Sequence, residues 1–215
     1  MKREVKWNLC GALALMVAFA LWTWLVCVVD VAPIGPRDSQ VGFSALNGSF
    51  HALVGVNMAL YTVTDWLGLV PIAVALGFGV MGLAQWIKRK RILRVDCSIL
   101  VLGGFYVAVM AVYVLFEMVV INRRPVLIEG YLEASYPSST TMLVMCVMPT
   151  AMMQCKARVR VRALRAVLLW SMGAFLAFMV VGRVLSGVHW ITDIIGGALV
   201  SCGLVLAYRA GVQAL

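Results

Sequence analysis

Long apolar segments alternate with short polar segments along the 215-residue chain. A helix needs about 20 consecutive apolar residues to cross the hydrocarbon core of a bilayer, and six segments are long enough. The pattern therefore predicts an all-α, polytopic membrane protein, a six-transmembrane-helix bundle formed by a single domain over residues 1–215. The six predicted spans are Leu9–Val29, Thr62–Trp86, Asp96–Val120, Pro137–Gln154, a segment that ends near Arg183, and His189–Ala207.

Two features near the N-terminus qualify this pattern. Ala18-Phe19-Ala20 resembles a signal-peptide cleavage site, but the apolar segment continues well past it, which favours an uncleaved first helix. The polar segment Asp30–Ser49 contains proline, glycine and an Asn-Gly turn signal, so it predicts a loop. Phe50–Tyr61 then predicts a short interfacial helix that carries His51.

The composition excludes a soluble protein. Hydrophobic residues make up 63% of the chain and charged residues only 13%, with a mean hydropathy of +0.98, whereas soluble domains are roughly 45–50% apolar. The net charge of +9 does not indicate a nucleic-acid partner, because membrane proteins concentrate lysine and arginine on their cytoplasmic loops. The six cysteines lie in or beside apolar segments without metal-binding or disulfide spacing, so we interpret them as small core residues.

The basic residues are distributed unequally between the two sides of the predicted bundle. Six spans place both termini on one side, and that side carries 14 of the 18 lysines and arginines. This bias predicts that both termini are cytoplasmic, and we expect the protein in the plasma membrane. The opposite, extracytoplasmic side carries the other four basic residues, which are Arg37, Arg123, Arg124 and Arg183.

The stretch 182–193 gathers three ionisable residues, Arg183, His189 and Asp193, at the extracytoplasmic side. If the chain is helical from residue 190, His189 and Asp193 lie one turn apart on the same face. A carboxylate beside an imidazole can hold one ring nitrogen and leave the other free as a base or nucleophile. The arginine offers a planar fork suited to phosphate oxygens. The alternative is an interfacial histidine and arginine, with Asp193 as a helix-start residue.

The start of the fourth span lies on the same side. Pro137 and the serines and threonines at positions 138–141 predict a helix N-terminus, where unpaired N–H groups and the helix dipole attract anions. The alternative interpretation is plain N-capping by the hydroxyl groups. Arg123 and Arg124 either join the same anion pocket or bind lipid headgroups.

Taken together, residues 60–205 resemble the type 2 phosphatidic acid phosphatases, a superfamily of six-span membrane phosphatases. Its signatures are Lys, six residues and Arg-Pro; then Pro-Ser-Gly-His; then Ser-Arg, five residues, His, three residues and Asp. The third signature is present as Arg183, His189 and Asp193, with Gly182 in place of the serine. The other two are partly present, as Arg124-Pro125 with Glu117 at the lysine position and as Pro137-Ser138 with Ser139 and Thr140 at the Gly-His positions.

The resemblance implies a role for each matching residue. His189 would attack phosphorus and form a phosphohistidine, and Asp193 would orient its ring. The phosphate would be bound by Arg124, Arg183 and Ser138, with Ser139, Thr140 and Arg123 beside them. No cluster of carboxylates and histidines suggests a metal site, so we expect neither a metal nor another cofactor.

The departures from the signatures affect the proton that a leaving group needs. In the family the second-signature histidine protonates the departing oxygen, which Thr140 cannot do at ordinary pH. Glu117 adds a negative charge where the family has a positive one, and it either pairs with an arginine or acts as an acid. Arg123 can compensate its charge. His51 is a further candidate acid, and its alternative is a surface-helix residue without a catalytic role.

Two functions follow from these residues. The first is a lipid phosphatase that acts at the extracytoplasmic face on a phosphorylated membrane lipid. Phosphate is a better leaving group than an alkoxide, so the missing acid favours a polyprenyl diphosphate over phosphatidic acid-type lipids. The second is a catalytically impaired relative that binds or carries phosphorylated lipid without turnover. The intact third signature favours the enzyme, and the sequence does not indicate an oligomeric state.

Overall fold

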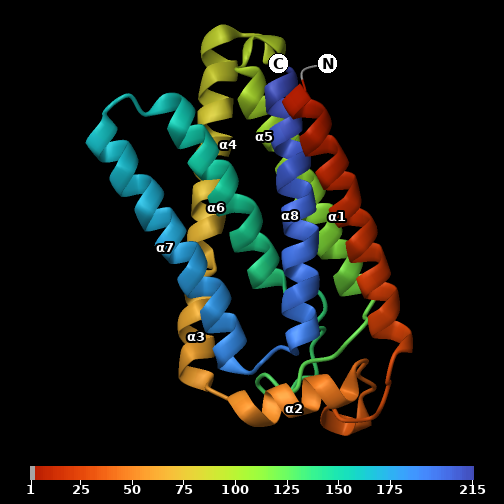
Figure 1. Ribbon diagram of the computed structural model, residues 1–215. Coiled ribbons are helices and arrows are strands. Elements are labelled where there is room, and N and C mark those ends of the chain that lie inside the picture. The colour runs from red at the N-terminus through yellow and green to blue at the C-terminus, as the bar shows by residue number, and fades with distance from the viewer. Residues whose placement is uncertain (1–2) are drawn as a thin grey trace.

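The computed structural model describes residues 3–215 and is a bundle of long helices (Figure 1). Within these residues there are isolated β-bridges but no strand, so the predicted all-α class is confirmed. Two short 3₁₀ turns, Pro36–Asp38 and Ile92–Arg94, interrupt the loops. The helices are α1 (Arg3–Val28), α2 (Ser44–Val54), α3 (Met58–Leu67), α4 (Leu69–Arg89), α5 (Cys97–Met118), α6 (Ser139–Arg158), α7 (Arg162–Ser186) and α8 (Ile191–Ala214).

Five helical segments within residues 3–215 are long and apolar enough to cross a membrane. They are α1, α5, α7, α8 and the nearly continuous pair α3–α4, Met58–Arg89. The fourth predicted span corresponds to α6, which is 20 residues long but is not among the five. Nine of its residues are buried inside the protein, including Thr141, Thr150 and Gln154. Polar side chains in α6 therefore face other helices, which lowers its hydropathy.

The helices pack around α6 and α8, which lie at the centre of the bundle (Figure 1). α1 lies along α8 for most of its length, and the start of α1 and the end of α8 lie at the same end of the bundle, called here the end with the termini. There Asn8 donates a 2.6 Å hydrogen bond from Nδ2 to Oε1 of Gln213. A cluster of buried apolar residues that includes Phe19, Tyr136 and Tyr208 joins α1, α5, α6 and α8.

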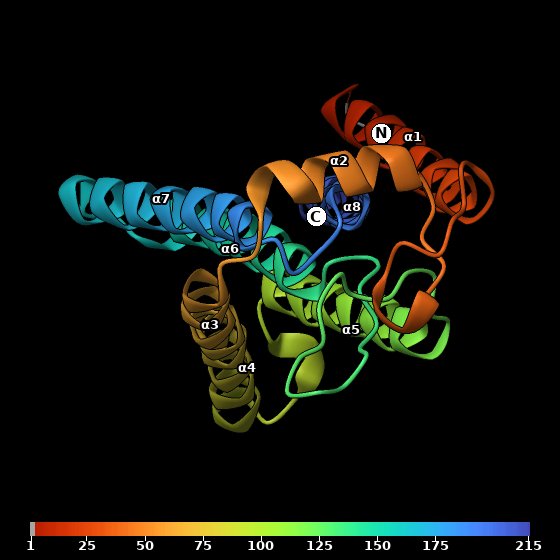
Figure 2. The ribbon, with the colours of Figure 1, turned by 90° about the horizontal axis from the view of Figure 1, so that it is seen from below.

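The opposite end of the bundle is covered by α2 and by the loop between α5 and α6 (Figure 2). α2 does carry His51, but the predicted Phe50–Tyr61 helix is wrong in its boundaries. α2 runs from Ser44 to Val54 and α3 begins at Met58. The break falls at Gly55, whose φ of +69° is easily adopted only by glycine.

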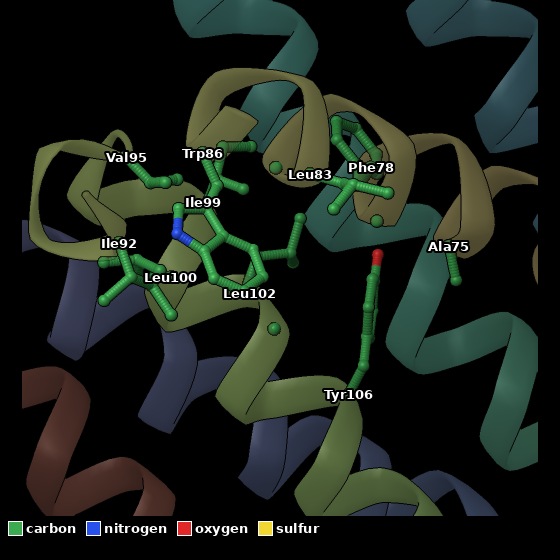
Figure 3. Close-up of a pocket in the computed structure, with 13 residues that line it drawn as sticks. Ala75, Phe78, Leu83, Trp86, Ile92, Val95, Ile99, Leu100, Leu102 and Tyr106 are labelled. Carbon is green, nitrogen blue, oxygen red and sulfur yellow. The ribbon is translucent and has the colours of Figure 1, made fainter. Parts of the chain in front are cut away.

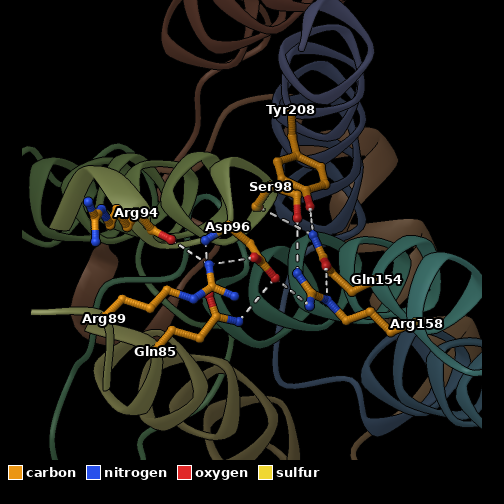
Figure 4. Close-up of polar contacts among 8 residues, drawn as sticks. All are labelled: Gln85, Arg89, Arg94, Asp96, Ser98, Gln154, Arg158 and Tyr208. Carbon is orange, nitrogen blue, oxygen red and sulfur yellow. Dashed lines mark hydrogen bonds and ion pairs between the residues drawn. The ribbon is translucent and has the colours of Figure 1, made fainter. Parts of the chain in front are cut away.

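Polar residues join four helices at the end that carries the termini (Figure 4). Asp96, just before α5, accepts hydrogen bonds from Arg89 of α4 at 3.0 Å and from Arg158 of α6 at 2.9 Å. Gln154 donates to the Tyr208 hydroxyl of α8 at 2.7 Å. These two arginine–aspartate pairs hold the helix ends together, and the hydrogen bonds from Arg158 and then Arg89 lower the pKa of Asp96.

Candidate active site

His189 lies in the short connection between α7 and α8. The turn depends on Gly187, which has a φ of +65° and lies so close to the Gly55 carbonyl that no side chain would fit. Asn57 also donates its backbone N–H to the Ser186 carbonyl at 2.9 Å. The α7–α8 turn is thereby fixed against the α2–α3 turn, and His189 is held inward with only 5% of its surface exposed.

Ser135 connects His189 to Asp193. The Ser135 hydroxyl donates to Oδ2 of Asp193, and its oxygen lies 3.0 Å from Nδ1 of His189. Because the hydroxyl proton points to the carboxylate, Nδ1 is the protonated ring nitrogen and Nε2 carries the free lone pair. The expectation that Asp193 contacts His189 directly is therefore corrected: within residues 3–215 the hydrogen bonds join the two side chains through Ser135.

Asp193 is fully buried and surrounded by donors. Asn122 donates from Nδ2 to Oδ1 at 3.0 Å, and the Trp190 backbone N–H donates to Oδ2 at 3.1 Å. The second of these bonds caps α8, which begins at Ile191 rather than at Trp190. Asp193 thus serves as a helix-start residue, as one interpretation of the sequence expected, and it also anchors Ser135.

Two buried arginines lie near the His189 imidazole. Arg183 is 1% exposed, and its Nη2 lies 3.4 Å from Nε2 of the imidazole. Tyr61 of α3 lies against both guanidinium groups, at 4.9 Å from Arg183 and 5.7 Å from Arg124. Within residues 3–215, Nε and Nη1 of Arg124 and Nε of Arg183 are buried without a hydrogen-bond partner. Buried N–H donors without partners are costly, and they favour an anion that supplies acceptors.

Each arginine also has a carboxylate nearby. Nε of Arg124 lies 3.0 Å from Glu133, but the pair lacks the alignment of a hydrogen bond. Nη1 of Arg183 lies 3.6 Å from Asp65. Both carboxylates are about half exposed, so water weakens these pairs. A phosphate group that brings two or more charges can displace them.

The electrostatic environment keeps the His189 imidazole neutral. Burial lowers its pKa well below the usual value of 6.5, and the positive charges of Arg124 and Arg183 lower the pKa further. A neutral imidazole with a free Nε2 is the form that can act as a nucleophile. Burial therefore disfavours protonation of His189 and keeps its imidazole in the form that can act as a nucleophile.

The start of α6 lines a small pocket beside His189. Ser139, the first residue of α6, lines it together with His189 and with Tyr113 and Glu117 of α5. Ser138 is fully buried; its hydroxyl bonds to Thr141 at 3.0 Å and its N–H donates to the Asp193 carbonyl. Thr140 lines a neighbouring cavity with Asp65 instead.

A comparison of the sequence with protein-family profiles identifies the family of this chain. The profile of the PAP2 superfamily matches residues 104–215, which is more than half of the chain and covers most of α5 and all of α6 to α8. The chain belongs to the PAP2 superfamily. The resemblance inferred from the three signatures is thus confirmed.

The PAP2 fold extends over nearly the whole chain. A transmembrane PAP2-type phosphatidylglycerolphosphate phosphatase from Bacillus subtilis superposes with a TM-score of 0.56 at 19% identity, over 95% of this chain and 97% of that one. At this identity the likeness shows a common fold. No curated protein matches the sequence.

The structure brings some of the predicted site residues together and places others elsewhere. His189, Ser139 and Glu117 line one small pocket. Arg183 contacts the His189 imidazole, and Arg124 lies near it. His51 packs on Trp190 with ring centres 5.4 Å apart, and it is not among the residues that line the His189 pocket; burial lowers its pKa. The Arg123 guanidinium donates to the Leu132 carbonyl at 2.9 Å and braces the α5–α6 loop.

Three residues of the site were not predicted, namely Ser135, Asn122 and Tyr61. Ser135 lies two residues before the second signature, and Asn122 lies within the first, two residues before Arg124. Polar residues so close to a signature, in a loop predicted to face the site, were the available signal. Tyr61 gave none, since it is separated from Arg183 by more than one hundred residues and only the fold brings them together.

Proposed function

We propose that this protein is a membrane lipid phosphatase that hydrolyses a polyprenyl diphosphate through a phosphohistidine intermediate. One observation carries the proposal: Nη2 of buried Arg183 lies 3.4 Å from Nε2 of His189, and within residues 3–215 three nitrogens, Nε of Arg183 and Nε and Nη1 of Arg124, are buried without a hydrogen-bond partner. A tetrahedral phosphate beside Nε2 would accept those donors. Membership in the PAP2 superfamily supports the same reaction class.

In the first step, the lone pair of Nε2 attacks phosphorus. A P–N bond forms, the bond from phosphorus to the bridging oxygen breaks, and the lipid leaves as a monophosphate. Arg124 and Arg183 stabilise the charge on the transferred group, and Ser135 with Asp193 holds the imidazolium N–H at Nδ1. Water then attacks the phosphohistidine, which releases inorganic phosphate and restores the neutral imidazole. We assign the exchange of the proton of this water to Glu117, which lines the pocket.

The residues around the leaving group support a diphosphate substrate. Thr140 stands at the position of the family's acid and lines the adjoining cavity, and a hydroxyl is too weak an acid to protonate an alkoxide. Departing lipid monophosphate needs no such proton. Phosphatidic acid-type lipids would depend on Glu117 alone as a proton donor.

Two apolar cavities between α4 and α5 support a long lipid chain. The first, about 330 Å³, reaches from Asp65 and Thr140 to Ile72. The second, about 280 Å³, begins at Ala75 and ends near Trp86 (Figure 3). From residue 65 to residue 86 the helical rise is about 30 Å, roughly twice the thickness of one leaflet. A polyprenyl chain can extend over that length, whereas the acyl chains of one leaflet cannot.

The orientation follows from the charges. We propose that all six helices, α6 included, span the plasma membrane with both termini cytoplasmic and the His189 pocket extracytoplasmic. The 14 basic residues assigned by sequence to the side of the termini support this orientation.

The test is phosphate release by the purified protein, with a chelator present, from a polyprenyl diphosphate and from phosphatidic acid. We expect the diphosphate to react about 10²-fold faster, because general acid assistance is worth about 10²–10⁴-fold. Thr140→His should accelerate phosphatidic acid hydrolysis selectively, and Glu117→Gln should slow it.

Each contrary result has a defined meaning. Equal rates for both lipids that neither substitution changes would refute the leaving-group argument. Binding of both lipids without any phosphate release would instead establish the alternative, a lipid-binding relative without turnover. Activity that the chelator abolishes would contradict a reaction carried out by side chains alone.

A further inference from the structure

A separate cavity, lined by basic residues, lies at the end of the bundle that carries the termini. It measures about 340 Å³ and is formed by α6 and α8, with Lys156 and Arg209 among its lining residues. Its other lining residues are the apolar Met153 and Val212 and the amide Gln213. From His189 to Arg209 the helical rise is about 30 Å, so this cavity is separate from the proposed active site and lies near the opposite membrane surface.

The two cations of this cavity lack carboxylate partners. Both side chains are exposed, and neither forms an ion pair in the part of the chain that the structure describes. Nearby Arg158, in contrast, is paired with Asp96 (Figure 4). By sequence, this end of the protein contains only two acidic residues, Glu4 and Asp96. Asp96 is already occupied by two arginines, and Glu4 receives a 3.4 Å hydrogen bond from Gln213.

The surroundings favour a lipid over a free anion. Gln213 is held at the rim by its 2.6 Å bond from Asn8 of α1, while Met153 and Val212 form an apolar wall beside the cations. A phosphate ion has no use for such a wall, whereas a phospholipid places its phosphate at the cations and its acyl chains along the helices. Basic pockets between membrane helices are suited to anionic headgroups.

We infer that this cavity binds the headgroup of an anionic phospholipid in the leaflet on the side of the termini. Lys156 and Arg209 contact the phosphate from two different helices, and the acyl chains lie against Met153 and Val212. The bound lipid therefore links α6 to α8, the helices that hold Ser139 and Asp193 at their other ends. The inference is independent of the proposed reaction, because it concerns binding at a different site.

The test uses the full-length protein in detergent micelles, titrated with phosphatidylglycerol, with phosphatidylcholine, or with inorganic phosphate. Native mass spectrometry counts bound lipid, and the thermal unfolding midpoint reports the linkage to stability. We expect phosphatidylglycerol to bind and to raise the midpoint, and the other two additives to do neither. Lys156→Gln combined with Arg209→Gln should weaken lipid binding by about 30-fold.

Lys88→Gln combined with Arg91→Gln is the matched control, because it removes two exposed cations from the same end outside the cavity. It should leave phosphatidylglycerol binding unchanged. Equal weakening in both double variants would mean diffuse attraction and would overturn the inference, as would equal binding of phosphatidylcholine. Stabilisation by inorganic phosphate would replace the lipid site by a simple anion site.

A variant that keeps both cations covers the case in which the double variant does not fold. Met153→Trp fills the apolar side of the cavity and should reduce phosphatidylglycerol binding. Unchanged binding in Met153→Trp would exclude this cavity as the lipid site.

Discussion

The arginines at the two ends of the bundle differ in burial and in pairing. The end with the termini carries, by sequence, 14 basic and 2 acidic residues, whereas the other end carries 4 basic and 7 acidic residues. Yet the buried guanidinium nitrogens without hydrogen-bond partners, within residues 3–215, belong to Arg124 and Arg183 at the acidic end. At the basic end, Arg89 and Arg158 share the carboxylate of Asp96.

This difference separates structural cations from cations that await a ligand. A structural arginine is paired and partly hydrated, so it costs little and joins helix ends. A buried arginine with unpaired donors lowers the stability of the protein by itself, and such a cost is typical of binding and catalytic sites. Pairing and burial, rather than the number of basic residues, therefore identify the functional end.

The largest expected effect comes from removing the nucleophile. His189→Ala should lower phosphate release by at least about 10⁴-fold, because it removes the ring nitrogen that attacks phosphorus in the proposed reaction. At the other end, Gln154→Ala removes the bond to Tyr208 and should lower the thermal unfolding midpoint while leaving the rate per folded molecule unchanged. Turnover close to wild type in His189→Ala would exclude the phosphohistidine.

Arginine substitutions test the comparison directly. Arg183→Gln should lower kcat/KM by about 10²–10³-fold, the usual effect of removing a donor to a developing anion. It should also raise the thermal unfolding midpoint, because a buried charge is removed. Arg89→Gln should do the reverse, with lower stability and full activity. A loss of activity of similar size in both variants would end the distinction between the two kinds of arginine.

Ser135 provides a smaller effect with a close control. Ser135→Ala breaks the connection from His189 to Asp193 and should lower kcat by about 10–100-fold, as loss of an outer orienting partner does, with little change in KM. Ser98 is the serine at the other end, and it accepts a 3.0 Å hydrogen bond from Arg158. Ser98→Ala should leave kcat unchanged. Full activity in Ser135→Ala would show that the hydrogen-bonded connection through Ser135 does not contribute to catalysis.

The sequence predicted most of the fold because membrane-spanning helices are recognisable from the length and apolarity of their segments. α1, α5, α7 and α8 each lie close to a predicted span. The exceptions have physical causes. α6 is less apolar because it packs against other helices, and the helix around His51 was displaced because one glycine, Gly55, ends α2.

The site was predictable where its residues are close in sequence and less so where only folding joins them. His189 and Arg183 lie six residues apart, so their proximity follows from the chain. The contact of Tyr61 with Arg183 depends on the packing of α3 against α7. The position of Ser135 between His189 and Asp193 depends on a loop that carries no periodic signal. The spacing in the sequence identified His189 and Asp193 as partners, but it predicted a direct contact where the structure joins them through Ser135.

The smallest expected effect concerns the paired end and its dependence on pH. Hydrogen bonds from Arg158 and Arg89 lower the pKa of Asp96 from its usual 3.8, so this carboxylate stabilises the fold above that pH. The contribution is lost as the pH falls from 3.8 through the lowered native value. Asp96 is partly exposed, so we expect Asp96→Asn to reduce stability by only about 1 kcal/mol at pH 7.

Thermal unfolding in detergent across pH measures this effect, with Glu4→Gln as the control for a carboxylate at the same end that has only a 3.4 Å contact. Wild type and Asp96→Asn should converge once the pH falls below the lowered native pKa of Asp96, where both side chains are neutral, and their difference at pH 7 should shrink in high salt. Glu4→Gln should follow the wild type throughout. A pH-independent difference between wild type and Asp96→Asn would mean that Asp96 acts through packing. The conclusion that Arg89 and Arg158 stabilise the fold by pairing with Asp96 would then be wrong.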